Sequence, residues 1–99
     1  MSKCKDIINT YIEVASEWSE YSIDEIRKSR KEDCTNLRHI IINLLTKEGI
    51  SKSRICQEFH ITPQNVNSIL SNYTERKRIF KRLERDEKEI QNKVESKEK

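Results

Sequence analysis

The chain has 99 residues, of which 33% are hydrophobic and 37% are charged, and its formal net charge at pH 7 is +3. That length suits one domain with a modest core, which we place at residues 1–94, followed by a frayed tail at residues 95–99. One glycine and one proline leave little turn chemistry for β-hairpins, and no apolar run approaches the ~18 residues of a membrane span. The composition therefore excludes β-rich and membrane-spanning folds and predicts an all-α bundle of five to six helices.

Two amphipathic helices are predicted in the N-terminal part of the chain. The first covers residues 5–18, and the residues on its apolar stripe are Ile8, Tyr11, Ile12, Ala15 and Trp18. The sequence Ser22-Ile-Asp-Glu25 is a capping box, in which the serine and glutamate side chains each accept from a backbone N–H at the helix start. A short second helix is therefore expected after Ser22, with Ile23 and Ile26 pointing inward.

A basic run at residues 27–31 leads into a longer predicted helix. Ser29-Arg-Lys-Glu32 has the form of a second capping box, which places the start of that helix at Ser29. Its end is expected near Lys47, because Gly49 can adopt the positive φ that closes a helix. We interpret it as the central helix of the core, and the residues expected on its buried side are Cys34, Leu37, Ile40, Ile41, Ile42, Leu44 and Leu45.

Residues 51–71, SKSRICQEFHITPQNVNSILS, predict two helices joined by a tight turn at residues 60–61. Ser51 can cap the first helix and Thr62 the second, with Pro63 at a position where its missing N–H costs nothing. Apolar positions expected to pack inward are Ile55, Cys56, Phe59, Ile61, Val66, Ile69, Leu70 and Tyr73. The opposite face of the second helix carries uncharged hydrogen-bonding residues: Gln64, Asn65, Asn67, Ser68 and Ser71. This pattern is typical of a helix-turn-helix.

Two arrangements remain open for the C-terminal part. Apolar residues recur at four–three spacing as far as Val94, which fits a continuous helix that forms a homodimer through residues 76–94. Alternatively, a break near residues 73–77 lets a last helix pack Phe80 and Leu83 back onto the domain. We favour the break, because charged residues interrupt the heptad pattern at two positions.

Charge is distributed unevenly along the chain. Residues 1–26 hold two basic and six acidic side chains, a net charge of −4. Residues 27–85 hold fourteen basic and six acidic side chains, a net charge of +8. Residues 86–99 hold four basic and five acidic side chains, a net charge of −1. The basic surplus coincides with the predicted helix-turn-helix and its flanks, where a polyanion would dock.

A family resemblance is carried by Ile23-Asp-Glu-Ile26, Lys28-Ser-Arg-Lys31, Leu37-Arg-His-Ile40, Leu44, Ile55, Phe59 and Val66. With these residues, the stretch 22–70 resembles domain IV, the C-terminal DNA-binding domain of the bacterial replication initiator DnaA, a Trp-repressor-like helix-turn-helix. The resemblance implies that Lys28, Arg30 and Lys31 form a basic loop near the minor groove. The chain departs from the family at residues 62–65, where Thr-Pro-Gln-Asn replaces Asp-His-Thr-Thr, so the family's base preference is not carried over. It also has no glycine-rich phosphate loop, so no ATPase activity is expected.

The function expected from these features is sequence-specific binding of double-stranded DNA, by a cytoplasmic, nucleoid-associated regulator of transcription or replication. Asparagine and glutamine suit adenine, because one amide can accept from N6 and donate to N7. The residues expected to read bases are Thr62, Pro63, Gln64, Asn65, Asn67 and Ser68. The residues expected to contact phosphate or the minor groove are Lys28, Arg30, Lys31, Lys52, Arg54 and Ser71.

The alternative interpretation is a helical protein-interaction module that dimerises through its charged C-terminal helix. An enzyme is not expected, because His39 and His60 have no acid or cysteine beside them in a catalytic pattern. Cys4, Cys34 and Cys56 are widely spaced and form no Cys-x-x-Cys motif, so neither a metal site nor a cofactor is expected.

Overall fold

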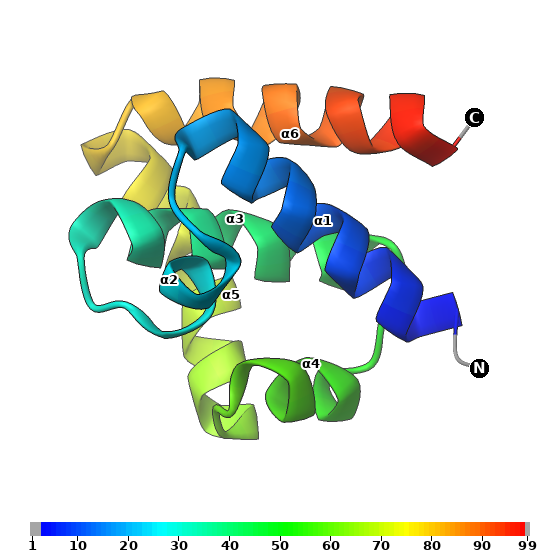
Figure 1. Cartoon of the computed structure of the whole chain (residues 1–99). Coiled ribbons are helices and arrows are strands. Elements are labelled where there is room, and N and C mark those ends of the chain that lie inside the picture. Colours follow the sequence, from blue (N-terminus) through cyan, green and yellow to red (C-terminus); the bar gives the residue numbers. More distant parts are fainter. Residues whose placement is uncertain (1–2, 99) are drawn as a thin grey trace.

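The centre of the molecule is α3 (Glu32–Lys47), which contacts every other helix. The computed structural model describes residues 3–98, with side chains described for residues 5–97. The other helices are α1 (Lys3–Ser19), α2 (Ile23–Lys28), α4 (Lys52–Phe59), α5 (Pro63–Ile79) and α6 (Arg82–Glu98) (Figure 1). No strand occurs in this part of the chain, so the predicted all-α bundle is confirmed.

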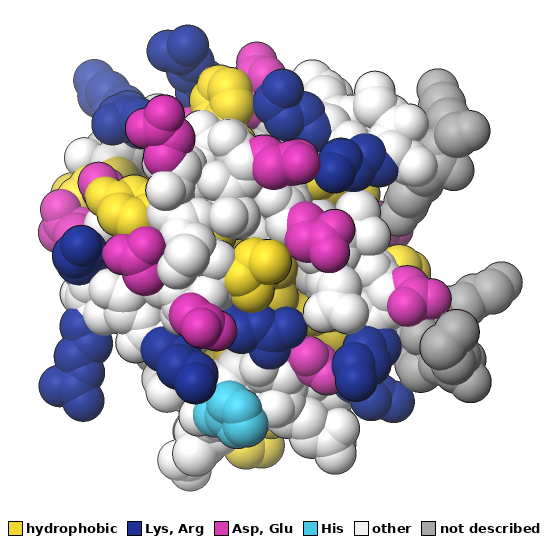
Figure 2. Space-filling model, viewed as in Figure 1, with side chains coloured by type: hydrophobic (Ala, Val, Ile, Leu, Met, Phe, Trp, Pro, Cys, Tyr) yellow, Lys and Arg dark blue, Asp and Glu magenta, His cyan; other side chains and the backbone are white. Residues whose placement is uncertain are grey.

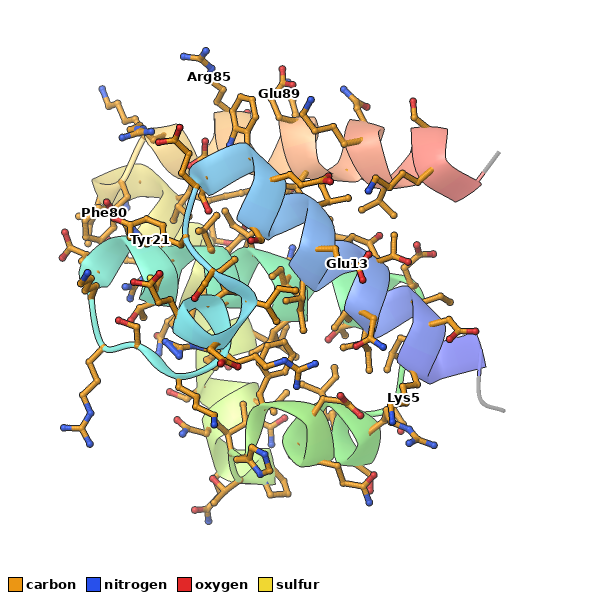
Figure 3. All side chains as sticks on the ribbon, viewed as in Figure 1. Lys5, Glu13, Tyr21, Phe80, Arg85 and Glu89 are labelled. Carbon is orange, nitrogen blue, oxygen red and sulfur yellow. The ribbon has the colours of Figure 1, made fainter. Side chains whose placement is uncertain are left out.

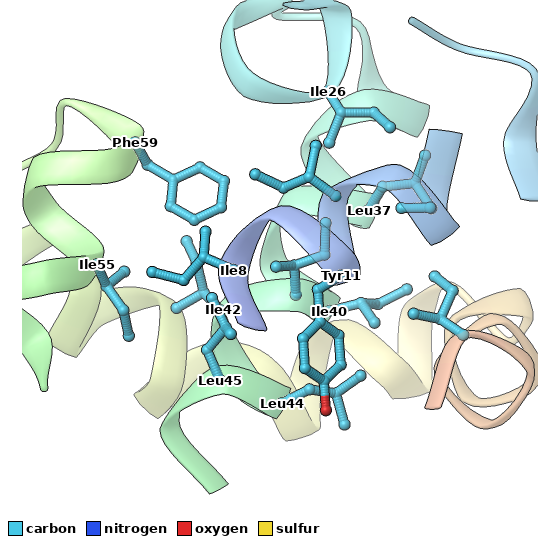
Figure 4. Close-up of a cluster of buried hydrophobic side chains, with 14 of the residues drawn as sticks. Ile8, Tyr11, Ile26, Leu37, Ile40, Ile42, Leu44, Leu45, Ile55 and Phe59 are labelled. Atoms are coloured by element: carbon cyan, nitrogen blue, oxygen red, sulfur yellow. The ribbon is translucent and has the colours of Figure 1, made fainter. Parts of the chain in front are cut away.

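The apolar side of α3 forms the middle of the core, as predicted. Its buried residues are Cys34, Leu37, Ile40, Ile41, Ile42, Leu44 and Leu45. Figure 4 shows this side meeting Ile8 and Tyr11 of α1, Ile26 of α2, and Ile55 and Phe59 of α4. Each such side chain stabilises the fold by roughly 1.5–3 kcal/mol on burial, so these contacts fix the positions of α1, α2 and α4 on α3.

The helix ends follow the predicted caps at α2 and at the end of α3. Both hydrogen bonds of the capping box between Ser22 and Glu25 are present. Gly49 has a φ of +90° and donates its N–H to the Thr46 carbonyl, which closes α3. Ile26 is fully buried, but the inward placement of Ile23 is wrong, because its side chain is 42% exposed. Side chains tilt toward the N-terminus of a helix. The side chain of Ile23, the first residue of α2, therefore points beyond the end of the helix and into solvent.

The predicted capping box at Ser29 does not form. α3 begins at Glu32, its N-cap position is Lys31, and no side chain caps it. The Ser29 hydroxyl instead accepts from the Lys31 N–H at 3.1 Å. The preceding loop is held by Arg38 of α3, whose guanidinium donates to the carbonyls of Arg27 and Ser29. This contact keeps residues 29–31 out of the helix.

The chain breaks between α5 and α6, so the continuous C-terminal helix is excluded. The break lies at Phe80 rather than near residues 73–77, because α5 continues until the Phe80 ring reaches the core. Leu83, Ile90 and Val94 of α6 are buried within the chain, so they cannot form the apolar seam of a coiled coil. α6 is helical as far as Glu98, beyond the position where the sequence predicts a frayed tail.

A buried carboxylate joins α6 to α5. Glu87, one of the charged interruptions of the heptad pattern, is only 8% exposed. It accepts a hydrogen bond from the Tyr73 hydroxyl at 2.6 Å and lies 3.3 Å from Lys77 Nζ. Burial and the Glu87 carboxylate raise the pKa of Tyr73. Glu87 therefore has partners that compensate for its burial.

Candidate nucleic-acid interface

α4 and α5 are joined by a tight turn at residues 60–62, and both predicted N-caps form. The Ser51 hydroxyl accepts from the Arg54 N–H at the start of α4, and the Thr62 hydroxyl accepts from the Asn65 N–H at the start of α5. His60 ends α4 in the left-handed conformation, with φ 56° and ψ 47°. A non-glycine residue there costs energy, although histidine is among the residues found in it more often. The turn thus fixes how α5 leaves α4.

The uncharged face of α5 is exposed to solvent. Val66 and Tyr73 are buried and Ile69 and Leu70 are half-buried, which leaves the opposite face of the helix outside the core. The residues on that exposed face are Thr62, Pro63, Gln64, Asn65, Asn67, Ser68 and Ser71. Asn72 adjoins it, donating to the Ser68 hydroxyl at 3.3 Å, and was missed by the sequence prediction. No charged residue lies between Pro63 and Thr74, so this surface offers neutral donors and acceptors.

Lys52 of α4 contacts this face directly. Its Nζ donates to Asn67 Oδ1 at 2.5 Å. Since an ammonium group has no acceptor, the amide oxygen of Asn67 must face Lys52, and the NH2 group is left for another partner. Lys52 was predicted to contact only phosphate, but the structure makes it a partner of a predicted base-reading residue. Arg54, the other predicted phosphate contact on α4, is half-buried.

The basic loop between α2 and α3 is anchored to the end of α4. Arg27 donates to the Glu58 carbonyl at 2.9 Å and lies 3.6 Å from the Glu58 carboxylate. A cation at a helix C-terminus is favourable, because the last carbonyls carry partial negative charge. Arg27 also donates to Asn9 of α1 at 3.3 Å. The loop that follows Arg27 therefore begins beside the last turn of α4, close to the turn into α5.

The predicted cations of this loop differ in their availability. Lys28 and Arg30 are exposed, and their side chains have no hydrogen bond or ion pair within the described part of the chain. Lys31 lies 3.7 Å from Glu25 and 5.8 Å from the centre of the Tyr21 ring. Figure 2 shows basic and acidic side chains intermixed on the face seen from α1. Lys28 and Arg30 are thus the loop cations best able to take a new anionic partner.

The two histidines lie in different environments. His39 is half-buried on α3, where burial and the cations Arg76 and Arg38 lower its pKa to about 4. His60 is exposed in the turn. Cys34 is buried and Cys56 half-buried, both as free thiols, whereas the side chain of Cys4 lies outside the described residues.

Among residues 3–98, no helix is long and apolar enough to cross a membrane. Among the side chains that the structure describes, no group of three or more His, Cys, Asp or Glu is placed to hold a metal ion. Comparisons of the chain with protein-family models, with curated proteins and with solved structures found no match.

Proposed function

We propose that the chain binds double-stranded DNA sequence-specifically, with α4 and α5 acting as a helix-turn-helix. The observation that carries this proposal is the exposed, uncharged face at the start of α5, built on a turn with both helix starts capped. Base edges in the major groove offer neutral donors and acceptors, and amide side chains complement them without the desolvation cost of a charge. The resemblance to DnaA domain IV points the same way and suggests a regulator of transcription or replication.

In the proposed complex, the N-terminal half of α5 enters the major groove. Gln64 and Asn65 are exposed, and their side-chain amides make no hydrogen bond within the described part of the chain, so each can pair bidentately with adenine. Asn67 differs, because its oxygen faces Lys52 and only its NH2 group is left to donate. Asn67 therefore reads an acceptor, such as O6 or N7 of guanine or O4 of thymine.

Cations around the turn supply the phosphate contacts. Lys28 and Arg30 project from a loop that Arg27 and Arg38 hold in place. Arg54, half-buried on α4, and Ser71, at the C-terminal end of the uncharged face of α5, are the other two candidates for such contacts. Such contacts set the register of the protein on the duplex and carry no sequence information. Specificity is thus assigned to α5, and most of the salt-dependent affinity to the loop and α4.

The test begins with selection of bound duplexes from a random pool at a fixed salt concentration, followed by affinity measurement on the selected site. We expect Gln64→Ala and Asn65→Ala each to cost about 1–3 kcal/mol on that site and much less on random DNA. Asn92→Ala, which removes an exposed amide from α6, is the matched control and should change neither affinity. Equal losses on both DNAs, or no selected sequence, would contradict base reading by α5.

The loop is tested through the salt dependence of binding. Arg30→Ala should weaken binding to all sequences and reduce the slope of log K against log salt concentration by about one unit. Arg85→Ala is the matched control, because Arg85 is an exposed arginine on α6. An unchanged slope for Arg30→Ala would remove the loop from the interface.

A further inference from the structure

A groove lies at the corner where the end of α1, the start of α3 and the α5–α6 turn meet. Figure 3 shows two of its aromatic residues, Tyr21 and Phe80, close together at this end of the molecule. Leu37 and Leu83, both almost fully buried, lie at its base. The groove is also lined by the carboxylates of Glu17, Glu20, Asp33 and Asp86. Glu17 pairs with Lys97 at 3.2 Å, Asp33 accepts from Tyr21 and Asp86 accepts from Trp18, so Glu20 is the carboxylate without a partner in the described part of the chain. Figure 2 shows hydrophobic surface flanked by acidic side chains at this end.

The aromatic rings of this groove already have cations of the same chain over them. Lys93 lies 5.6 Å from the ring of Trp18, Lys31 lies 5.8 Å from that of Tyr21, and Arg76 lies 5.3 Å from that of Phe80. A small organic cation would have to displace these groups, so it does not suit the groove. The groove suits an occupant that presents an apolar side chain to its base and one positive charge to Glu20.

The same corner carries a ridge of that character, which we define as residues 78–82. Ile79 in this ridge is 67% exposed, more than Ile23, the other large exposed apolar residue among the described side chains. Arg78, which pairs with Glu75 at 3.1 Å, precedes Ile79 in the sequence. The following residues of the ridge, Phe80, Lys81 and Arg82, also line one wall of the groove. The free N–H groups in the first turn of a helix carry partial positive charge and repel cations. Arg82 lies at the start of α6, so its positive charge is not stabilised by the helix. Ridge and groove are thus complementary in charge and adjacent in position.

We propose that two copies of the chain associate through this corner, with the ridge of each copy in the groove of the other. Because ridge and groove are neighbours, a two-fold rotation forms both contacts at once, as in an isologous dimer. Ile79 of one copy would cover the apolar base of the groove, and Arg82 would face the carboxylate of Glu20, because neither of these two side chains has an ion pair within the described part of the chain. A standard interface covers about 800 Å² per partner, roughly an eighth of the 6414 Å² surface of the described chain.

This association does not depend on DNA binding. α5 separates the ridge at Ile79 from Pro63 by about 24 Å at 1.5 Å per residue, so the uncharged face near Thr62 stays free in the dimer. The proposed dimer therefore differs from the coiled coil through residues 76–94 that the sequence suggested. Its contacts lie at the corner between α5 and α6 instead of along α6.

The first experiment is sedimentation equilibrium of the pure chain without DNA over a range of concentrations. We expect a reversible change from the 11.9 kDa monomer to twice that mass. Ile79→Asp should raise the dissociation constant at least about 100-fold, because a buried isoleucine is lost twice in a two-fold dimer. Ile23→Asp is the matched control at the other exposed isoleucine and should leave the constant unchanged. A monomer at every concentration, or equal effects of the two variants, would overturn the proposal.

The second experiment exchanges charges across the proposed contact. Arg82→Glu and Glu20→Arg should each prevent self-association. In a dimer of two identical variant chains, position 82 of each copy would face a side chain of the same charge at position 20 of the other. The side chains of Arg82 and Glu20 have no hydrogen bond or ion pair in the described structure, so both variants should retain the helical circular dichroism of the parent. Mixed in equal amounts, they should form a heterodimer, in which both contacts again pair opposite charges. Two variants that stay monomeric when mixed would exclude this orientation of the copies.

Discussion

Replacing Tyr73 with phenylalanine should lower the free energy of unfolding by about 1.5–3 kcal/mol. The Tyr73 hydroxyl is 2.6 Å from Glu87 Oε1, Tyr73 is 4% exposed and Glu87 is 8% exposed. A hydrogen bond to a charged acceptor contributes about 1.5–3 kcal/mol. Glu87 keeps Lys77 at 3.3 Å and Lys47 at 4.0 Å in the variant, so its charge is not left without a partner. The loss should therefore not exceed the value of the hydrogen bond itself.

A double-mutant cycle separates this bond from other effects of the substitutions. Glu87→Leu alone leaves the Tyr73 hydroxyl buried without an acceptor, which costs about 1–3 kcal/mol. In the variant carrying both Tyr73→Phe and Glu87→Leu, neither side chain has an unpaired polar group, so the combined loss should be smaller than the sum of the single losses. Urea unfolding followed by circular dichroism gives all three values.

Tyr21 provides the matched control for this cycle. Its hydroxyl donates to Asp33 Oδ2 at 3.0 Å on the surface, so Tyr21→Phe removes the same kind of bond where water can replace it. Its effect should be much smaller than that of Tyr73→Phe. Additivity of the Tyr73 and Glu87 losses to within about 0.5 kcal/mol would refute the coupling that the structure implies.

Four further predictions concern the turn, the loop and α3. Lys52→Met should free the oxygen of Asn67 and shift selected sequences toward adenine at one position; an unchanged selection would separate Lys52 from base reading. Arg38→Met should speed amide hydrogen exchange in the loop before α3 and lower stability by about 1–3 kcal/mol, whereas normal protection there would show that another contact holds the loop. His60→Gly should raise the urea midpoint by relieving about 1 kcal/mol of left-handed strain, and a lower midpoint would contradict this. Folding lowers the pKa of His39 from 6.5 to about 4, so the unfolded chain binds a proton at a higher pH than the folded chain does. The free energy of unfolding should therefore fall as the pH decreases from 6.5 to 4, and it should fall less in His39→Gln. Parallel pH profiles of the two proteins would contradict this prediction.

Local features of the fold could be predicted because the responsible residues are neighbours in sequence. Ser22, Ser51 and Thr62 cap helices through backbone groups three positions away, which a sequence displays directly. The apolar spacing of α3 likewise predicts its buried side. Ser29 shows the limit of such patterns, because a residue of α3 holds its carbonyl and the helix begins later than the capping box indicates.

The surface around α5 was predictable in outline but not in its contacts. Exposure of Gln64 and Asn65 follows from helical periodicity once Val66 and Tyr73 are assigned to the core. The contacts between Lys52 and Asn67, and between Arg27 and Glu58, join residues on different helices, so no local pattern indicates them.

α5 runs without interruption from Pro63 to Ile79 and is embedded in the core at Val66 and Tyr73. Its two ends carry the two surfaces proposed above, the uncharged face that begins at Thr62 and the ridge at Ile79. If occupancy of the corner changes the affinity of the uncharged face for DNA, the two binding events are coupled. Thermodynamic linkage makes such an influence mutual: the factor by which corner occupancy changes affinity for DNA is the factor by which DNA changes affinity at the corner.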